Sequence, residues 1–258
     1  MFVNFIETIG RKTINFFDEL GQVVRLLVQI IKYFPNIFKS RKLVLFQMEH
    51  IGVNSLPLVF VIASFTGAVA AWQAAYQLAG IAPLSFLGTA TSRAIITELG
   101  PVLTALVLAG RVGSSIAAEL GSMKVTEQID ALETMGISPV RFLAMPRFVA
   151  SIIMLPILVI FANIIAVLGA FLISNYFLDV SSAVFFESAK RYFEIWDFLF
   201  GVTKGLFFGG VTALIGCYIG FRTEGGAEGV GNSTIRSFVL CAAMILILDL
   251  LLWTLLFS

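Results

Sequence analysis

Residues 123–146 read MKVTEQIDALETMGISPVRFLAMP, a polar stretch between two long apolar segments. Val125, Ile129 and Leu132 recur within it at helical spacing. The pattern predicts a short amphipathic helix over about residues 123–135. A helix that joins two membrane-type segments in this way indicates a polytopic membrane protein rather than a soluble one.

The end and the polar face of this helix indicate a role. Gly136 stands where a helix C-cap would lie, and Pro139 prevents the helix from continuing. The polar face carries three acids, Glu127, Asp130 and Glu133. We expect a membrane protein that presents such a helix to the cytoplasm to offer it to a partner protein. An ordinary solvated loop helix is the alternative.

The composition is that of an integral membrane protein. Of the 258 residues, 59% are hydrophobic and 13% are charged, and the mean hydropathy is +0.97. A soluble chain carries about a quarter charged residues. The apolar segments leave no room for a sizeable soluble domain. The net charge of +1 says nothing about nucleic acid, but no basic patch interleaved with aromatic residues is present, so we expect no nucleic-acid partner.

The sequence lacks the residues that several kinds of catalytic, metal and nucleotide sites require. His50 is the only histidine, and Cys217 and Cys241 lie in apolar surroundings that favour small core residues. No G-x-x-x-x-G-K-[ST] motif is present, so ATP cannot be bound through a P-loop. We therefore expect no enzymatic activity and no bound cofactor or metal. Energy has to come from a partner's nucleotide site or from an ion gradient.

Residues 1–50 are predicted to form an amphipathic helix and a basic connector. Apolar residues recur every three or four positions, with charged residues between them. They are Phe2, Phe5, Ile6, Ile9, Phe16, Phe17, Leu20, Val24, Leu27, Ile31 and Phe34. We expect one helix, or two with a break near Gly21, lying in the headgroup plane. The alternative is a helix packed on the protein's own spans.

Residues 51–258 are predicted to form a single domain of five membrane spans. Each apolar stretch is long enough for a bilayer, which needs about 20 helical residues. The stretches are Val53 to Ala79, about Leu87 to Ala118, Phe148 to Leu178, Phe198 to Phe221, and Ser237 to the C-terminus. The fold class is therefore all-α. We also expect short helical pieces over residues 179–197 and a flexible glycine-rich turn over residues 222–236.

The distribution of Lys and Arg predicts that the N-terminus lies in the cytoplasm and the C-terminus on the outer side of the membrane. This orientation puts thirteen basic residues inside and three outside. The inner set is Arg11, Lys12, Arg25, Lys32, Lys39, Arg41, Lys42, Arg111, Lys124, Arg141, Arg147, Arg222 and Arg236, and the outer set is Arg93, Lys190 and Arg191. The 123–135 helix then faces the cytoplasm.

Motifs concentrated in residues 98–147 carry a family resemblance. They are Glu98-Leu-Gly-Pro101, Ala109-Gly-Arg111-Val-Gly-Ser-Ser115, Ala118-Glu-Leu-Gly121, Glu127-Gln-Ile-Asp-Ala-Leu-Glu-Thr-Met-Gly136, Pro139, and Pro146-Arg147. The segment loosely resembles the cytoplasmic coupling motif of ABC importers. More closely, these motifs resemble the MlaE (YrbE) family of lipid-transport permeases, and the number of spans and the amphipathic N-terminus also fit.

The resemblance implies a homodimeric permease of an ATP-driven phospholipid transporter in the inner membrane of a double-membraned bacterium. Its implied partners are a cytoplasmic ABC ATPase that uses ATP and Mg²⁺, a periplasmic MCE-domain lipid-binding protein, and a STAS-domain subunit. Such a system moves phospholipid between the inner membrane and the periplasm and maintains outer-membrane lipid asymmetry.

The resemblance also assigns the 123–135 helix to ATPase coupling. The acids would contact basic residues of the ATPase, and two apolar side chains would anchor the contact. The predicted coupling residues are Glu127, Asp130, Leu132, Glu133, Met135 and Gly136.

Charged residues inside the spans are candidates for a lipid cavity. A charge near the bilayer centre costs roughly 2.5–3.5 kcal/mol, so Glu98 should face a cavity or a partner. Glu98 and Lys204 have similar expected depths and form a candidate pair, with Asp249 as the competing partner of Lys204. We hypothesise that Arg93 and Glu98 line the outward part of a lipid cavity. A purely structural ion pair is the alternative.

Aromatic and basic residues at the span ends have two interpretations each. Trp72, Gln73 and Tyr76 near the outer end of span one are either an interfacial belt or part of the lipid cavity. Arg111, Arg141 and Arg147 are expected to reach anionic headgroups. For Arg111, the alternative is that its side chain holds the coupling helix in place. The face formed by Ala63, Gly67, Ala71 and Ala75 is predicted to pack closely on another span.

Other functions remain as rivals. One is an ABC importer permease for another hydrophobic or small solute. A permease for a polar solute would need more polar side chains in several spans. Another is a membrane lipid enzyme, for which one histidine and scattered acids supply no acid–base set. A structural membrane anchor would not explain Glu98, Lys204 and Asp249 inside the spans.

Overall fold

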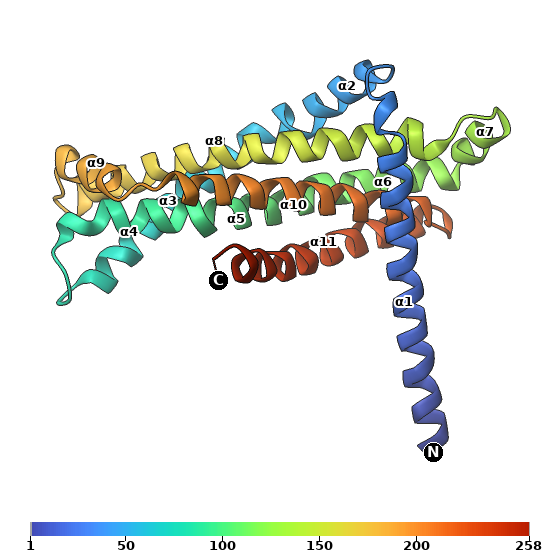
Figure 1. Ribbon diagram of the computed structural model, residues 1–258, viewed down its shortest axis with the longest axis horizontal. Coiled ribbons are helices and arrows are strands. Elements are labelled where there is room, and N and C mark those ends of the chain that lie inside the picture. Colours follow the sequence, from blue (N-terminus) through green and yellow to red (C-terminus); the bar gives the residue numbers. More distant parts are fainter. Residues whose placement is uncertain (1, 258) are drawn as a thin grey trace.

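Five long apolar helical stretches lie side by side in an elongated bundle (Figure 1). The structure is a computed structural model that describes residues 2–257, with the side chains of residues 11, 14, 17–35 and 37–256. The stretches that can cross a membrane are Arg41–Leu78, Leu84–Val125, Val140–Phe177, Ile195–Phe221 and Gly226–Leu256. Residues 2–257 contain no strand. The predicted all-α integral membrane protein with five spans is confirmed.

Residues 2–257 form eleven α-helices and six short elements of other helix types. The α-helices are α1 (Phe2–Lys32), α2 (Arg41–Ile51), α3 (Leu56–Leu78), α4 (Leu87–Ala94), α5 (Gly100–Leu108), α6 (Ser114–Val125), α7 (Gln128–Thr134), α8 (Met145–Phe177), α9 (Ser182–Arg191), α10 (Ile195–Phe221) and α11 (Gly226–Phe257). The 3₁₀-helices are η1 (Phe34–Asn36), η2 (Val53–Ser55) and η3 (Leu84–Phe86). The π-helical segments are η4 (Ile95–Leu99), η5 (Ala109–Gly113) and η6 (Val140–Ala144).

Two of the π-helical segments end one residue short of a proline. At the end of η4 the Gly100 N–H donates to the Ile95 carbonyl, five residues back, and Pro101 follows. At the end of η6 the Met145 N–H donates to the Val140 carbonyl in the same way before Pro146. A proline ring clashes with the carbonyl one turn earlier and supplies no N–H, so one extra residue in the preceding turn accommodates it.

Small residues let the central helices approach to backbone distance. The predicted face of α3 is buried against α8, and a Cβ added at Gly67 would lie 1.8 Å from the Ala166 carbonyl oxygen. A Cβ added at Gly209 of α10 would lie 2.5 Å from the Ser151 carbonyl oxygen of α8. Membrane helices associate by such close packing because lipid provides no hydrophobic driving force between them. The predicted packing face of span one is confirmed.

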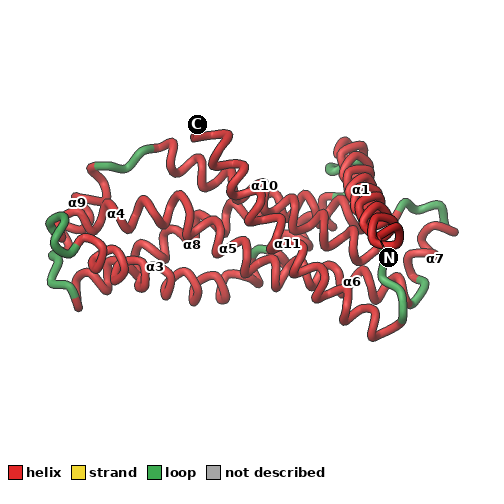
Figure 2. The backbone as a smooth tube through the Cα atoms, turned by 90° about the horizontal axis from the view of Figure 1, so that it is seen from below, coloured by secondary structure: helices red, strands yellow, loops and turns green. Residues whose placement is uncertain are grey.

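Helix α1 lies across the bundle. Its axis is nearly perpendicular to the long helices in Figure 1, and it is foreshortened in Figure 2. Leu26 and Ile30 are buried where α1 meets α10 and η6, whereas Leu20, Val24 and Ile31 are exposed. A helix with one face on the spans and an apolar face outward suits the membrane surface. The helix therefore packs on the protein's own spans, which was the alternative, and its place in the headgroup plane stays a prediction.

The helix is a single element, without the break considered near Gly21. Part of its predicted apolar face lies outside the described side chains. These residues are Phe2, Phe5, Ile6, Ile9 and Phe16.

The prediction of a flexible turn over residues 222–236 is wrong for most of that range. Helix α11 begins at Gly226, and the chain reverses through Gly225 and Gly226, whose φ angles are +87° and +68°. The Thr223 hydroxyl donates to the Ser233 hydroxyl at 2.9 Å, which ties the turn to the new helix. Glycines that suggested a loop lie in the first turns of a packed helix.

Helix α9 covers the far end of the bundle, as expected for residues 179–197. Ser181 caps it by accepting from the Val184 N–H, and Phe185 is fully buried. The Thr89 hydroxyl of α4 donates to the Ser188 carbonyl at 2.7 Å. These contacts fix α9 on the second span.

Because α3 and α8 lie so close together, one added methyl group between them should lower the stability of the protein. Gly67→Ala should lower the free energy of unfolding by about 1–3 kcal/mol, because the helices must separate to accept the Cβ. Thermal unfolding of the purified protein in detergent measures the change. Gly110→Ala is the matched control, because its Cβ would meet only the Phe238 ring at 3.5 Å. Equal melting temperatures for both variants would contradict the packing account.

Candidate functional site

The segment between spans two and three folds as a short helix with a defined stop. Helix α6 ends at Val125, and Glu127 adopts a left-handed conformation with φ +59° before α7 begins. At the other end the Gly136 N–H donates to the Glu133 carbonyl and the Ile137 N–H to the Leu132 carbonyl, both at 2.9 Å. With φ +75° at Gly136, this is a Schellman C-cap.

The helix is shorter than the predicted 123–135, because the left-handed Glu127 divides that range. Residues 123–125 complete α6, and the separate helix is α7, Gln128–Thr134. The predicted stop at Gly136 is confirmed by the cap.

Helix α7 presents acids outward and apolar residues inward. Ile129 is buried and Leu132 is half-buried, whereas Glu127, Glu133 and Met135 are exposed. The face that points away from the bundle is therefore acidic, with Met135 as an exposed apolar side chain at its end.

Asp130 differs from the other two acids. Its carboxylate accepts from the Lys124 ammonium at 2.7 Å, which ties α7 to the end of α6. This ion pair was not predicted, although opposite charges six residues apart offered a signal.

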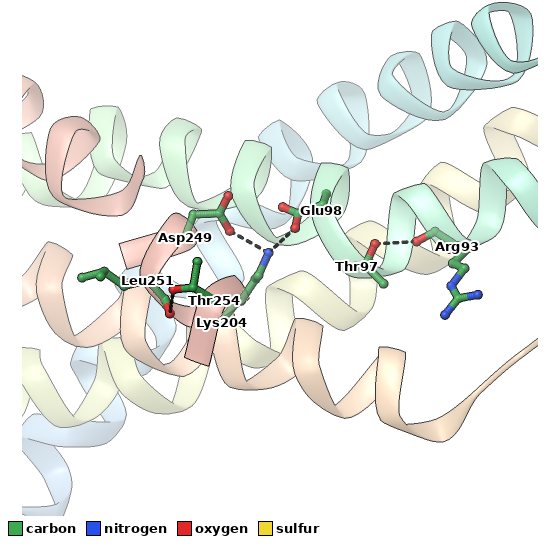
Figure 3. Close-up of polar contacts among 7 residues, drawn as sticks. All are labelled: Arg93, Thr97, Glu98, Lys204, Asp249, Leu251 and Thr254. Atoms are coloured by element: carbon green, nitrogen blue, oxygen red, sulfur yellow. Dashed lines mark hydrogen bonds and ion pairs between the residues drawn. The ribbon is translucent and has the colours of Figure 1, made fainter. Parts of the chain in front are cut away.

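The charges inside the spans converge on Lys204. The Lys204 Nζ lies 2.6 Å from Glu98 Oε1 and 2.7 Å from Asp249 Oδ1, and the three residues come from spans four, two and five (Figure 3). Lys204 has no exposed surface, whereas the Glu98 side chain is 35% exposed. The candidate pair Glu98–Lys204 is confirmed, and Asp249 is a simultaneous partner rather than a competitor.

Aromatic rings complete the surroundings of the Lys204 ammonium. Its Nζ lies 4.6 Å from the centroid of the Phe200 ring and 5.4 Å from that of Trp253. Rings and carboxylates together replace the water that a buried ammonium would otherwise need. The cluster joins three spans near the middle of the 27-residue α10.

Arg93 is separate from this cluster. It points away from Lys204 in Figure 3, and its Nε lies 2.9 Å from Asp197 Oδ2. Asp197 is buried in the first turn of α10, where the helix dipole also favours a carboxylate. The partner of Arg93 was not predicted, although the depth argument that pairs Glu98 with Lys204 also puts Arg93 near the level of Asp197.

The aromatic residues of span one lie on the exposed side of α3. Trp72 contacts the Phe177 ring edge-on at 6.2 Å between centroids, and Tyr76 is 83% exposed. Gln73 lines a groove of about 410 Å³ between α3 and α5, together with apolar residues that include Leu99 and Leu103. Thr66 and Gln73 are the polar side chains of its otherwise apolar lining.

The six residues predicted for a lipid cavity therefore occupy three places. Glu98 and Lys204 belong to the buried cluster, Arg93 to a pair near α9, and the span-one residues to the surface of α3. Within the described residues, no group of His, Cys, Asp and Glu side chains could hold a metal ion.

Two arginines expected at headgroups are held by the protein instead. Arg147 is buried, with Nη2 at 2.8 Å from Glu119 Oε1 and Nη1 donating to the Leu143 carbonyl at 2.8 Å. Arg111 Nη1 donates to the Ser55 hydroxyl. The expectation is wrong for Arg147, because its position one turn into α8 faces α6 rather than lipid. The Arg147–Glu119 pair fixes the start of span three to the end of span two, on either side of α7.

Comparisons with known proteins cover nearly the whole chain. A family model described as "Permease MlaE" matches residues 44–255. The chain is 37% identical to a "probable ABC transporter permease protein" of Rickettsia typhi over all of both chains. It is 34% identical to the "intermembrane phospholipid transport system permease protein MlaE" of Haemophilus influenzae, over all of this chain and 99% of that one. A probable ABC transporter permease of Synechocystis is 37% identical over 85% of this chain and 83% of its own.

Removing the cation of the buried cluster should strongly lower the stability of the protein. Lys204→Met should lower the free energy of unfolding by about 3–5 kcal/mol, because Glu98 and Asp249 would remain together without a positive charge. Thermal unfolding in detergent measures it, with Lys190→Met in α9 as the control. The triple variant Lys204→Met, Glu98→Gln, Asp249→Asn should recover much of the loss. A single variant as stable as the wild type would refute the account.

Proposed function

The chain belongs to the MlaE family of ABC transporter permeases, and from that premise we propose that it is the membrane subunit of an ATP-driven phospholipid transporter. The full-length likeness to the Haemophilus influenzae phospholipid transport permease carries this proposal. The chain catalyses no covalent chemistry and binds no cofactor of its own. Phospholipid moves between the inner membrane and periplasmic lipid-binding partners.

The energy is supplied by a cytoplasmic ABC ATPase that docks on α7. Glu127 and Glu133 contact basic residues of the ATPase, and Met135 is the apolar anchor, which their exposure supports. Leu132, Asp130 and Gly136 stabilise the helix and do not contact the ATPase. An ATPase that moves α7 also moves the joined ends of spans two and three, because the Lys124–Asp130 and Arg147–Glu119 pairs connect them.

Lipid chains follow the groove between α3 and α5. Its lining is almost entirely apolar, which suits acyl chains better than a polar solute. The groove lies on the surface of one chain, so a second copy facing it would enclose a larger cavity, in keeping with a homodimer. Trp72 and Tyr76 form the outer part of this wall.

The Lys204 cluster keeps spans two, four and five together while the groove changes shape. The exposed part of Glu98 is the point at which this cluster reaches a headgroup, and Arg93 lies on the outward side of it. A permease that alternates between two conformations needs such internally rigid parts.

The same proposal includes the location of the chain in the cell and its other protein partners. The chain lies in the bacterial inner membrane with its N-terminus in the cytoplasm and its C-terminus in the periplasm. A periplasmic MCE-domain protein exchanges lipid with the dimer, and a STAS-domain subunit joins the ATPase side.

The transport proposal predicts ATP-dependent lipid transfer by the assembled complex. Proteoliposomes that contain the permease, its ATPase and labelled phospholipid should transfer label to the purified MCE-domain protein only when ATP is hydrolysed. Val69→Trp and Leu103→Trp fill the groove and should reduce transfer severalfold, whereas Leu255→Trp on exposed α11 should not. Uptake of a soluble solute without lipid transfer would favour an importer instead.

The coupling proposal predicts a charge-dependent contact. Glu127→Lys and Glu133→Lys should each reduce copurification of the ATPase by about 10-fold, because reversed charges repel its basic groove. Glu187→Lys on α9 is the matched control, since it reverses an exposed acid at the opposite end of the bundle. Undiminished association and transport in both variants would exclude α7 as the ATPase contact.

A further inference from the structure

A second cavity, of about 560 Å³, lies beside the α7 end of the bundle. Its lining comes from the segment between α1 and α2, from the first turn of α2, and from the segment that follows α7. The lining residues are Tyr33, Lys39, Ser40, Lys42, Leu43, Gly136, Ile137, Ser138, Arg141 and Phe142. The exposed acids of α7, the α3–α5 groove and the Lys204 cluster contribute no residue to it. The cavity is therefore a separate site.

The charges around this cavity are all positive. Lys39 and Lys42 line it from one segment and Arg141 from the other. No acid is among its lining residues, and within the described residues none of these cations is ion-paired. Three cations converging on one concavity favour a bound anion.

The polar groups of the lining suit a phosphate. Tyr33, Ser40 and Ser138 bring hydroxyl groups to the same cavity. An arginine fork and lysine ammonium groups are the side chains that bind phosphate oxygens in proteins, and hydroxyls add hydrogen bonds. The lining therefore matches a phosphate ester better than a simple carboxylate.

The surroundings of the cavity place that phosphate at a membrane surface. The connector is the continuation of α1, which lies across the spans (Figure 1). Phe38 next to Lys39 is 88% exposed, and Phe46 and Phe142 are 60% and 42% exposed. Exposed aromatic residues beside exposed cations are typical of the headgroup region.

We propose that this cavity binds the headgroup phosphate of an anionic phospholipid from the leaflet on which α1 lies. Lys39, Lys42 and Arg141 contact the phosphate, and the neighbouring aromatic side chains contact the acyl chains. The bound lipid joins the α1–α2 connector to the segment after α7. This resident lipid is distinct from any transported lipid, so the proposal does not depend on the direction or cargo of transport.

Lipid binding to the full-length protein tests the proposal. The purified protein in mild detergent is titrated with short-chain phosphatidylglycerol, and bound lipid is counted by native mass spectrometry. The triple variant Lys39→Gln, Lys42→Gln, Arg141→Gln should bind at least about 10-fold more weakly, because each cation near an anionic lipid contributes to affinity.

A matched control removes the same charge from the same surface. Arg25→Gln, Lys32→Gln, Arg41→Gln changes three exposed cations that do not line the cavity. Binding within about twofold of wild type is expected, since the cavity is intact. Equal losses in both triple variants would mean general surface attraction and overturn the site.

Two further arms separate the lipid from other ligands. Phosphatidylcholine with the same chains should bind weakly, and glycerophosphoglycerol, the headgroup without chains, should not compete. Equal binding of the chainless compound would mean a soluble phosphate site and would overturn the lipid assignment. If the Lys39→Gln, Lys42→Gln, Arg141→Gln variant still binds lipid but no longer copurifies with the ATPase, the cavity is a protein-docking surface. That result would also overturn the lipid assignment.

Discussion

The buried ammonium of Lys204 is the interaction on which the arrangement of the spans depends. In a bilayer there is no water to solvate an ammonium, so its charge must be met by groups from the protein. Glu98 and Asp249 meet it from two other spans at 2.6 and 2.7 Å. Each of the three helices is thereby held at one depth and one rotation, and sliding any of them would separate buried charges.

Rigid connections continue from this cluster to the end of the bundle that carries α7. Spans two and three meet there through Arg147 and Glu119, and α7 is tied to span two through Lys124 and Asp130. Close backbone contacts between α3, α8 and α10 add stiffness along the bundle, because glycine at the contact leaves no side chain that could yield. Helix α7 and the adjoining ends of spans two and three are therefore one connected part of the structure rather than a loose loop.

The all-α class and the number of membrane spans could be predicted from the sequence alone. A bilayer requires about 20 apolar residues per helix, so five apolar stretches imply five spans without any knowledge of packing. The stop at Gly136 was equally local, since a residue with positive φ after an amphipathic helix is the usual glycine cap. Even the Glu98–Lys204 pair followed from depth alone, because a charge in lipid must find a partner near its own level.

Only the tertiary structure decided how the helices are rotated about their axes. That rotation brings Asp249 to Lys204 at the same time as Glu98, turns Arg147 inward to Glu119, and leaves Arg141 at a basic cavity. Helical periodicity states which residues share a face but not which neighbour that face meets. The π-helical turns near Pro101 and Pro146 shift the rotation by an extra residue, and a proline by itself does not predict such a turn, because Pro156 lies inside the continuous α-helix α8.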